Sequence, residues 1–500
     1  MTPFACLQAP PVAAGWSPED RVLAADVVVV GAGPGGAAVA LQLALAGADV
    51  LVLEEGPRRS RFRLNQANTA RFHMQEAGSM VAQGPTPFLV AAGRGVGGGS
   101  LINSALCFRT PRDVLAGWKD VVGDDRYSPE KLDPVFRWLE ENLQIGPARN
   151  DHVAGLHNLK IVEGATEMGL IAGLASRNTP ACIGCGACNF GCPSNGKASV
   201  NLNLLPEACK LGARIQAETR VSGFLLEGDR VVGVRGRMHD PETGLAGGQL
   251  TVNADKVVLS CGAIGTPRLL HFSGLAERMQ HVGDGLHVHP GSAVLARYPE
   301  PIYMWKGATQ GSWFESPDHP GVLPHAFTAP PEVVAMLIAP FVGGMKPAMA
   351  QLDHIGGILA LVSDKGEGTV RAFPDGRAWI TYDFAEGDIH RMKESMILCA
   401  EVQLRAGATA LYGVAHGLGA HDNLDDFAAA MRSRQIRDFI LYSSHPMSSV
   451  RMGRALDAGG KAIGVDGLWV ADASVFPTSL GVNPQLSTMA VATLIGQGIR

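Results

Sequence analysis

The chain has 500 residues, which is enough for two or three domain-sized units around a large core. Its composition is that of a globular protein, with 46% apolar residues and a formal net charge of -5 at pH 7. A mildly acidic chain offers no basic field for nucleic acid and no polybasic patch for an anionic membrane, so we expect neither partner.

The N-terminus contains no charged segment followed by an apolar one, so we expect no signal peptide and a cytoplasmic protein. This pattern still allows export together with a partner subunit that carries its own signal. The apolar stretch Val27–Ala48 is long enough to cross a bilayer, but the glycines and proline at its centre indicate a strand, a tight turn and a buried helix. We therefore predict no transmembrane segment.

The first elements form a β-α-β unit. Strands over Asp26–Val30 and Asp49–Leu53 flank a helix expected from Gly35 to about Ala46. This alternation is typical of a doubly wound α/β sheet. Further helices are expected over 129–143 and 205–211, with strands over 214–237 and a buried parallel strand over 256–260.

The pattern changes at about residue 292 to alternating strands, with a hairpin turn expected at Pro374–Gly376 and a long helix over Asp388–Ala406. The tail from Val465 returns to strand, loop and apolar helix. We therefore predict an α/β fold in which a mostly antiparallel sheet-plus-helix substrate domain is inserted into a doubly wound cofactor domain. The predicted boundaries are 1–120, 198–291 and 440–500 for the cofactor domain, 121–197 for a connecting region and 292–439 for the substrate domain.

A glycine-rich turn follows the first strand, and Gly31, Gly33 and Gly36 fit the pattern GxGxxG. The first glycine permits the tight turn, the second lets the backbone approach a pyrophosphate, and the third lets helix and strand pack closely. Glu54, at the end of the second strand, stands where a carboxylate accepts ribose hydroxyls, and the adjacent Glu55 fits this position less well. These residues predict a dinucleotide site but do not separate NAD from FAD.

Five later segments resemble, in order, the signatures of the glucose–methanol–choline (GMC) oxidoreductases. They are Gly93–Ala105, Ser260–Leu275, Val282–Pro290, His445–Gly453 and Val470–Ala490. The resemblance covers nearly the whole chain. It implies a GMC-type fold with FAD as the cofactor and the oxidation of an alcohol as the reaction.

The same resemblance implies particular contacts to FAD. The matching positions are Gly98, Ser100 and Asn103 along the flavin, Val221 beside the adenine, and Asp472 and Pro484 near the ribityl chain and the pyrimidine edge. Some relatives attach FAD covalently through a histidine in the first of these loops. The matching position here is Ile102 or a near neighbour, and no histidine is present. We therefore expect FAD to be bound non-covalently.

Alcohol oxidation by a flavin needs a base for the hydroxyl proton, and a histidine suits this role because its ordinary pKa lies near 6.5. His445 matches the catalytic base of the family, and Asn483 matches the position that hydrogen-bonds the substrate oxygen. His289 matches a family histidine that we expect to be structural or cofactor-supporting. Most relatives carry Gly-Thr-Cys where this chain has Ser448–Val450, so we expect a slightly different turn there.

Four cysteines lie within eleven residues. Cys182, Cys185, Cys188 and Cys192 give the spacing C-x2-C-x2-C-x3-C-P of bacterial ferredoxin runs, in which short turns let the thiolates converge on an iron–sulfur cluster. Because there is no second run, either all four hold one cluster or three do. Zinc, which commonly uses two separated pairs, and disulfides or free thiols are the alternatives.

The end of the run, Cys188–Ser199, is similar to the cysteine segment of iron–sulfur-containing FAD-dependent sugar and alcohol dehydrogenases of the GMC family, although their run starts with adjacent cysteines. It also resembles a segment of long-chain alcohol oxidases. The first resemblance implies a 4Fe–4S or 3Fe–4S cluster that passes electrons singly to a cytochrome, a quinone or a ferredoxin-like protein. We therefore predict a dehydrogenase. An oxygen-using alcohol oxidase with structural cysteines and a non-redox lyase of the same fold remain alternatives.

The inserted domain contains the apolar, methionine-rich stretch Pro330–Leu352, which is suited to line a pocket for a lipophilic alcohol or simply to pack in a core. Trp305, Trp313 and Phe314 are further candidates for that lining. We therefore expect a lipophilic alcohol that is oxidised to an aldehyde or a ketone.

Overall fold

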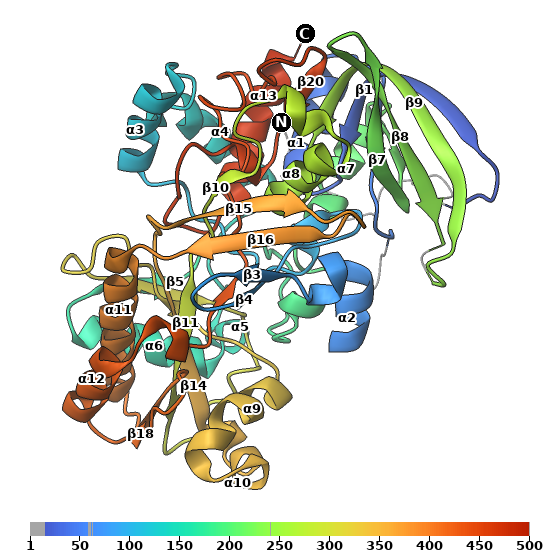
Figure 1. Cartoon of the computed structure of the whole chain (residues 1–500). Coiled ribbons are helices and arrows are strands. Elements are labelled where there is room, and N and C mark those ends of the chain that lie inside the picture. Colours follow the sequence, from blue (N-terminus) through green and yellow to red (C-terminus); the bar gives the residue numbers. More distant parts are fainter. Residues whose placement is uncertain (1–15, 59–61, 63, 241, 500) are drawn as a thin grey trace.

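The computed structural model of the chain describes residues 16–58, 62, 64–240 and 242–499. Residues 1–15, where we expected no signal peptide, lie outside this described part. Two sheets organise the fold, one in the upper half of the molecule and a larger one below it (Figure 1). Among the described residues, no helix is long and apolar enough to cross a membrane.

The upper sheet has the parallel centre of a doubly wound fold. Its strands follow the order β6-β2-β1-β9-β8-β7, and β20 also pairs with β9. They are β1 (Arg21–Val30), β2 (Val50–Leu53), β6 (Arg214–Gln216), β7 (Thr219–Glu227), β8 (Arg230–His239), β9 (Ala246–Leu259) and β20 (Leu468–Val470). All pairs are parallel except β7–β8 and β8–β9. Val27–Val30 is an unbroken apolar run because this part of β1 is covered on both faces.

Helices from both ends of the chain cover this sheet. The helix of the predicted β-α-β unit, α1 (Pro34–Leu45), packs against the last helix, α13 (Gln485–Gly498), and against α7 (Leu204–Lys210). The loops that precede α1 and α13 are thereby brought together, although more than 400 residues separate them in the sequence. The other helices of this half are α3 (Arg112–Val122), α4 (Pro129–Asn142) and α8 (Gly262–Phe272).

The lower sheet is mostly antiparallel, as predicted for the inserted domain. Its strands are β3 (Val81–Gln83), β4 (Phe88–Val90), β5 (Ile171–Leu174), β10 (Asp284–Leu286), β11 (Gly291–Arg297), β12 (Ser312–Glu315), β13 (His325–Ala326), β14 (Ile355–Leu361), β15 (Glu367–Ala372), β16 (Ala378–Asp383), β17 (Ala410–Gly413), β18 (Ala420–His421) and β19 (Tyr442–Ser443). The hairpin of β15 and β16 turns at the predicted place. The sheet also recruits strands from outside the predicted segment 292–439, such as β3, β4 and β5, so the domain boundaries stay a prediction.

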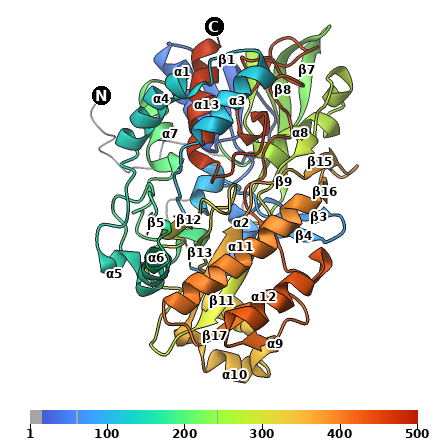
Figure 2. The ribbon, with the colours of Figure 1, turned by 90° about the vertical axis from the view of Figure 1, so that its left-hand side faces the viewer.

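One long helix, α11 (Glu386–Arg405), crosses the lower sheet diagonally, with α6 (Leu156–Glu167) and α12 (Leu424–Ser433) beside it (Figure 2). The buried side chains of α11 form a second core with the apolar side chains of β11 and β14. The chain also contains two short helices, α2 (Gln66–His73) and α5 (Asp151–Ala154).

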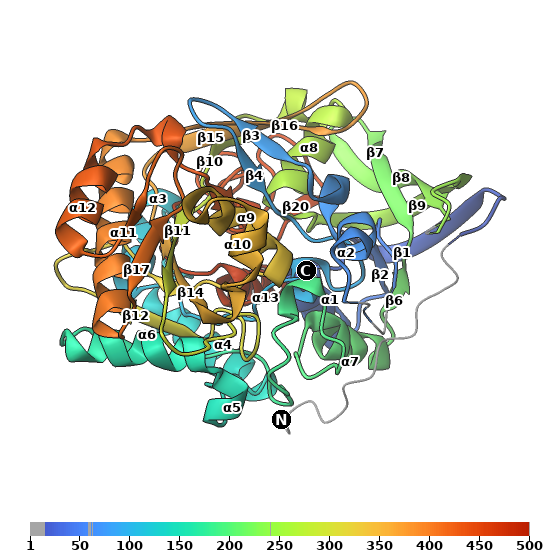
Figure 3. The same ribbon diagram turned by 90° about the horizontal axis from the view of Figure 1, so that it is seen from below.

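The apolar stretch Pro330–Leu352 forms α9 (Pro331–Val342) and α10 (Met345–Met349) at the lower end of the molecule, where both helices face the viewer in Figure 3. Their inner side chains pack in a separate core cluster with side chains of β11 and β14. They do not line the large cleft described below. The expectation that this stretch lines the substrate pocket is therefore wrong, because its inward-facing apolar side chains pack locally, while Met336, Met345 and Met349 are exposed.

Candidate functional site

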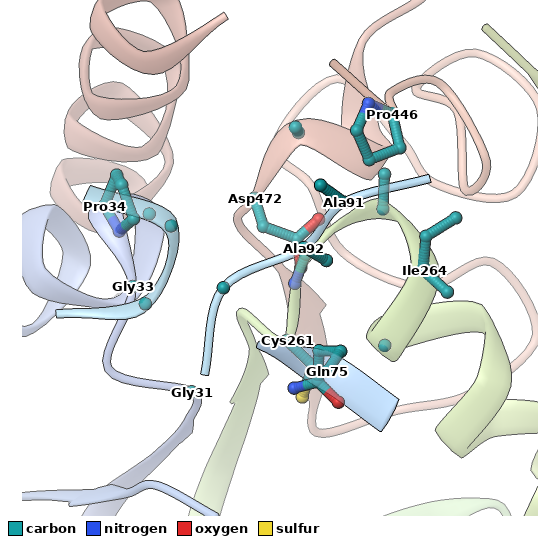
Figure 4. A pocket seen from close by; sticks show the side chains of 18 of the residues that line it. Gly31, Gly33, Pro34, Gln75, Ala91, Ala92, Cys261, Ile264, Pro446 and Asp472 are labelled. Atoms are coloured by element: carbon teal, nitrogen blue, oxygen red, sulfur yellow. The ribbon is translucent and has the colours of Figure 1, made fainter. Parts of the chain in front are cut away.

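A long cleft runs along the edge of the upper sheet and reaches the lower sheet. Most of the residues predicted to contact FAD line it: Gly31, Gly33, Glu54, Gly98, Ser100, Asn103, Val221, Asp472 and Pro484, together with His445 and Asn483. Figure 4 shows the turn with Gly31 and Gly33 on one side of the cleft, opposite Cys261 and Asp472. One elongated cavity therefore gathers segments from the whole chain.

The three fingerprint glycines have different surroundings. Gly31 has a φ of +109°, and a Cβ atom there would lie 2.2 Å from the carbonyl oxygen of Ser260. A Cβ atom at Gly36, which lies behind the turn, would be 1.9 Å from the carbonyl oxygen of Gly31. At Gly33 the nearest atom would be the Cα of Gly98, at 3.8 Å. The outer glycines are therefore needed for packing, and Gly33 leaves space where a pyrophosphate could approach the helix N-terminus.

Glu54 is buried at the end of β2, where its carboxylate joins three loops. It accepts hydrogen bonds from the backbone N–H groups of Ala32 at 3.0 Å, Gly56 at 2.9 Å and Gly95 at 3.0 Å. Burial raises the pKa of Glu54 to about 7, although these hydrogen bonds oppose the shift. A carboxylate has about four acceptor positions, so three donors leave room for a ribose hydroxyl.

Glu55 also lines the cleft, but its surroundings are ionic. Its carboxylate lies 3.8 Å from the guanidinium groups of both Arg220 and Arg268. Burial by itself would raise the pKa of Glu55, but Arg268, followed by Arg94 and Arg220, lowers it below its usual value. Glu55 is therefore an ion-pairing carboxylate, and Glu54 is the better match to the ribose-binding position.

Asp472 caps the first turn of α8 across the cleft. Its carboxylate accepts hydrogen bonds from the backbone N–H of Gly262 at 2.9 Å, from the hydroxyl of Thr266 at 2.6 Å and from the backbone N–H of Ser474 at 2.8 Å. Burial raises its pKa, and these hydrogen bonds oppose the rise. The neighbouring thiol of Cys261 donates to the carbonyl of Val30 at 3.3 Å. Asp472 thus fixes the position of α8 in the cleft wall.

His445 and Asn483 meet at the lower part of the cleft. The Nε2 atom of His445 and the Nδ2 atom of Asn483 are 3.0 Å apart, and both side chains are buried. His445 follows β19, and its backbone N–H donates to the hydroxyl of Ser443 at 3.3 Å. Asn483 stands just before α13. The fold therefore brings together two residues that the sequence analysis connected only through a resemblance.

Two further histidines surround this pair, and we call His289, His325 and His445 the histidine cluster. The Nε2 atom of His289 accepts a hydrogen bond from the backbone N–H of Gly481 at 2.9 Å, and its Nδ1 atom lies 3.4 Å from Nδ1 of His445. Burial lowers the pKa of His289 to about 4 and that of His325 to about 3. Burial, followed by the charges of these two neighbours, also lowers the pKa of His445 well below 6.5. The imidazole of His445 is therefore neutral at neutral pH.

The sequence analysis missed His325, because it lies on β13 in a stretch that matches none of the motifs. Periodicity gave no signal either, since β13 has only two residues. Trp305, Trp313 and Phe314 were expected to line the substrate pocket, but they do not line the cleft. Trp313 packs edge-on against Phe108, and Phe314 is fully buried in the lower core.

The turn after His445 has a backbone conformation that favours glycine, although the residue there is a serine. Ser448 has a φ of +68°, the left-handed region that favours glycine. Its backbone N–H donates to the carbonyl of Ala473 at 2.9 Å, and its hydroxyl donates to the carbonyl of Thr478 at 3.2 Å. These bonds hold Ser448 in a backbone conformation that glycine adopts more readily.

Cys182, Cys185, Cys188 and Cys192 line one small cavity, which we call the cysteine pocket. Backbone N–H groups lie near two of the sulfur atoms, since Gly184 donates to Cys182 and Lys197 to Cys192, both at 3.4 Å. The eight cysteines of the described part are free thiols. Within that part, however, no group of three or more His, Cys, Asp or Glu side chains is placed to hold a metal ion.

Cys188 is the buried member of the cysteine pocket. A guanidinium N–H of Arg177 donates to its sulfur at 3.2 Å. Burial by itself would raise the pKa of the Cys188 thiol, but Arg177 and Lys197 lower it below its usual value. Two buried cations thus favour a thiolate at this position.

The cysteine segment also forms part of the cleft wall. Asn189, next to Cys188, lines the cleft and accepts a hydrogen bond from the hydroxyl of Ser104 at 3.0 Å. The ammonium group of Lys197 donates to the carbonyls of Leu101 and Asn103, both at 2.9 Å. The cysteine segment therefore holds the loop that is predicted to lie along the flavin.

The fold and the cleft are those of an FAD-binding oxidoreductase, and comparison with known proteins agrees. A model of an FAD binding domain matches residues 26–77, and the N- and C-terminal models of the GMC oxidoreductases match residues 71–291 and 365–492. The chain belongs to the GMC oxidoreductase family. The predicted family and fold class are thereby confirmed.

Two curated relatives and one solved structure illustrate the match. An uncharacterized GMC-type oxidoreductase of Mycobacterium tuberculosis is 34% identical over 95% of this chain and 75% of its own length. A long-chain-alcohol oxidase of Arabidopsis thaliana is 29% identical over 95% of this chain and 68% of its own length. The crystal structure of pyridoxine 4-oxidase from Mesorbium loti has a TM-score of 0.70 at 18% identity, covers 95% of this chain and 98% of its own, and shares the fold.

Proposed function

We propose that the protein oxidises an alcohol to an aldehyde or a ketone, with non-covalently bound FAD as the hydride acceptor. The observation that carries the proposal is the 3.0 Å contact between Nε2 of His445 and Nδ2 of Asn483 in the cleft wall. When bound, FAD supplies the hydride chemistry, and the protein supplies orientation and a base. We propose that Gly33, Glu54 and Asp472 hold the cofactor. Gly33 leaves open space in the cleft wall, and the buried carboxylates of Glu54 and Asp472 place hydrogen-bond acceptors there.

The proposed roles follow from the charge states of the two side chains. In the tautomer with Nε2 unprotonated, neutral His445 has its free lone pair on the side of Asn483 and takes the hydroxyl proton at Nε2. The amide of Asn483 donates from Nδ2 to the same oxygen and stabilises the negative charge that develops on it. Because both side chains are buried, water competes little for these hydrogen bonds.

We further propose that the substrate is a lipophilic alcohol. Apolar side chains such as Ile102, Leu106 and Ile264 line part of the cleft. The relationship to a long-chain-alcohol oxidase over 95% of the chain supports the same substrate class.

The test is an anaerobic titration of the FAD-loaded protein with a series of alcohols of increasing chain length. We expect the flavin absorbance to bleach, with tighter apparent binding as the chain grows. A non-redox lyase would leave the flavin oxidised. A preference for short, polyhydroxylated alcohols would contradict the lipophilic substrate but not the oxidation.

We also propose that the cysteine pocket holds an iron–sulfur cluster, which makes the protein a dehydrogenase. The support is the chemistry of the segment: the four thiols share one cavity, backbone N–H groups lie near two sulfurs, and buried cations favour a thiolate at Cys188, although the cysteines of the described part are not placed as metal ligands in this structure. When bound, such a cluster supplies one-electron transfer to an external acceptor such as a cytochrome, a quinone or a ferredoxin-like protein.

The second candidate is an alcohol oxidase that reduces oxygen and uses the cysteines structurally, which the relationship to a long-chain-alcohol oxidase favours. Iron and acid-labile sulfide analysis of anaerobically purified protein separates the two. A dehydrogenase with a cluster contains both elements and reduces an artificial one-electron acceptor faster than oxygen. Protein with flavin, no iron and rapid peroxide formation would be the oxidase.

A further inference from the structure

His325 is a buried imidazole without a partner. Its side chain is fully buried on β13, and neither ring nitrogen has a hydrogen-bond partner within the described part of the chain. The ring of Phe108 packs edge-on against it, with the ring centroids 5.6 Å apart. Buried polar side chains without hydrogen bonds are rare in folded proteins, so such a group calls for a functional explanation.

Asn483 carries another buried polar atom without a partner. Its Oδ1 atom is also buried and without a partner among the described residues, whereas its Nδ2 atom faces His445. A hydrogen-bonding contribution from the side chain of Asn483 opposes the burial that lowers the pKa of His325, which agrees with these two unpartnered groups belonging together. No complete hydrogen bond joins them in this structure. An imidazole N–H of His325 can therefore form a hydrogen bond with Oδ1 of Asn483.

The orientation of the Asn483 amide decides what the substrate oxygen meets. With Oδ1 toward His325, the Nδ2 group points toward His445 and can donate to the oxygen. A rotation of the amide by half a turn would place Oδ1 there, and the substrate oxygen would lose its donor. A donor on the far side of the amide prevents this rotation.

We propose that His325 is a positioning residue, which donates a hydrogen bond to Oδ1 of Asn483 and thereby holds Nδ2 of Asn483 toward the substrate oxygen. This inference rests on the proposed alcohol oxidation. His325 does not line the cleft itself, so it acts on the substrate only through Asn483. A neutral imidazole is suited to this task, because one of its nitrogens always carries a proton.

The test compares His325→Phe, which removes the donor, with His325→Gln, which keeps one. Rapid anaerobic mixing with alcohol measures the rate constant of flavin reduction and the apparent dissociation constant separately. We expect His325→Phe to slow flavin reduction roughly 10- to 100-fold with a much smaller change in apparent affinity, and His325→Gln to recover most of the rate. Equal loss in both variants, or a loss in affinity alone, would overturn the proposal.

A double-mutant cycle with Asn483→Ala separates positioning from general damage. If His325 acts through Asn483, then His325→Phe slows the Asn483→Ala protein little further, whereas independent effects multiply. If His325→Phe does not retain FAD, the cycle is run with His325→Leu instead, and a multiplicative result there overturns the proposal. If no alcohol reduces the flavin of the unmodified protein, the proposed function itself fails and this inference with it. Normal reduction of that protein with no effect of His325→Phe overturns only the inference.

Discussion

His445 of the histidine cluster and Cys188 of the cysteine pocket are both buried, yet their surroundings favour opposite charge states. At His445, burial and two neighbouring imidazoles lower the pKa, so the neutral form is favoured. At Cys188, burial acts in the same sense against charge, but Arg177 and Lys197 outweigh it and favour the thiolate. The comparison teaches that burial alone does not set the charge of a site, because a fixed neighbouring charge can reverse its effect.

The largest expected effect comes from removing the proposed base. In His445→Ala, we expect the rate constant of flavin reduction by alcohol to fall by about 10²–10⁴-fold, because no other group accepts the hydroxyl proton. Stopped-flow absorbance measures this rate, and the flavin spectrum reports whether FAD is still bound. The exposed His390 provides a matched control, and His390→Ala should behave like the unmodified protein. Unchanged flavin reduction in His445→Ala would exclude this residue as the base.

The interactions of the cysteine pocket can be disrupted by a substitution at Lys197. Its ammonium group donates to the carbonyls of Leu101, Asn103 and Cys188, and Lys197→Met leaves these acceptors unpaired. We expect a loss of roughly 3 kcal/mol in the free energy of unfolding and weaker FAD retention, because the loop that is proposed to lie along the flavin loses its anchor. Denaturant unfolding and FAD release during dialysis measure the two effects. The exposed Lys131 serves as the matched control for loss of a lysine charge, and equal behaviour of Lys197→Met and Lys131→Met would contradict the anchoring role.

The pH dependence of flavin reduction should report the lowered pKa of His445 directly. Only the neutral imidazole accepts a proton, so the rate constant rises with pH up to the pKa and is constant above it. Because that pKa is lowered well below 6.5, we expect a constant rate from neutral pH down to below pH 6.5, with the decline at more acidic pH. A decline of the rate constant centred at or above pH 6.5 would show that burial does not lower the pKa of His445.

The smallest effect is expected at the turn after His445. Ser448→Gly relieves the positive φ but loses the hydroxyl bond to Thr478, so we expect the free energy of unfolding to change by less than about 1 kcal/mol. Ser448→Val adds a β-branched side chain at a positive φ and should destabilise the protein clearly more. Thermal unfolding of the two variants measures the contrast. Equal melting temperatures would mean that the backbone there is not strained.

The sequence by itself determined the local parts of this protein. Residues close together in the chain form the GxGxxG turn and the C-x2-C-x2-C-x3-C run, and the order of the segments can be read directly. The spacing of the residues within each motif sets its local geometry, which is why the sequence predicts it. The alternation of strands and helices likewise predicted the two sheets, and the hairpin of β15 and β16 appeared where its turn residues indicated.

The tertiary structure alone decided which distant groups meet. The packing of α1 against α13 and the pairing of β13 with β14 bring Asn483 and His325 to His445, although His325 belongs to no motif. It also decided that Pro330–Leu352 packs in a core away from the cleft, since an apolar pattern reports burial but not the partner. Finally, the charges at His445 and Cys188 depend on neighbours from other elements. Electrostatic effects of this kind cannot be predicted from the spacing of residues in the sequence.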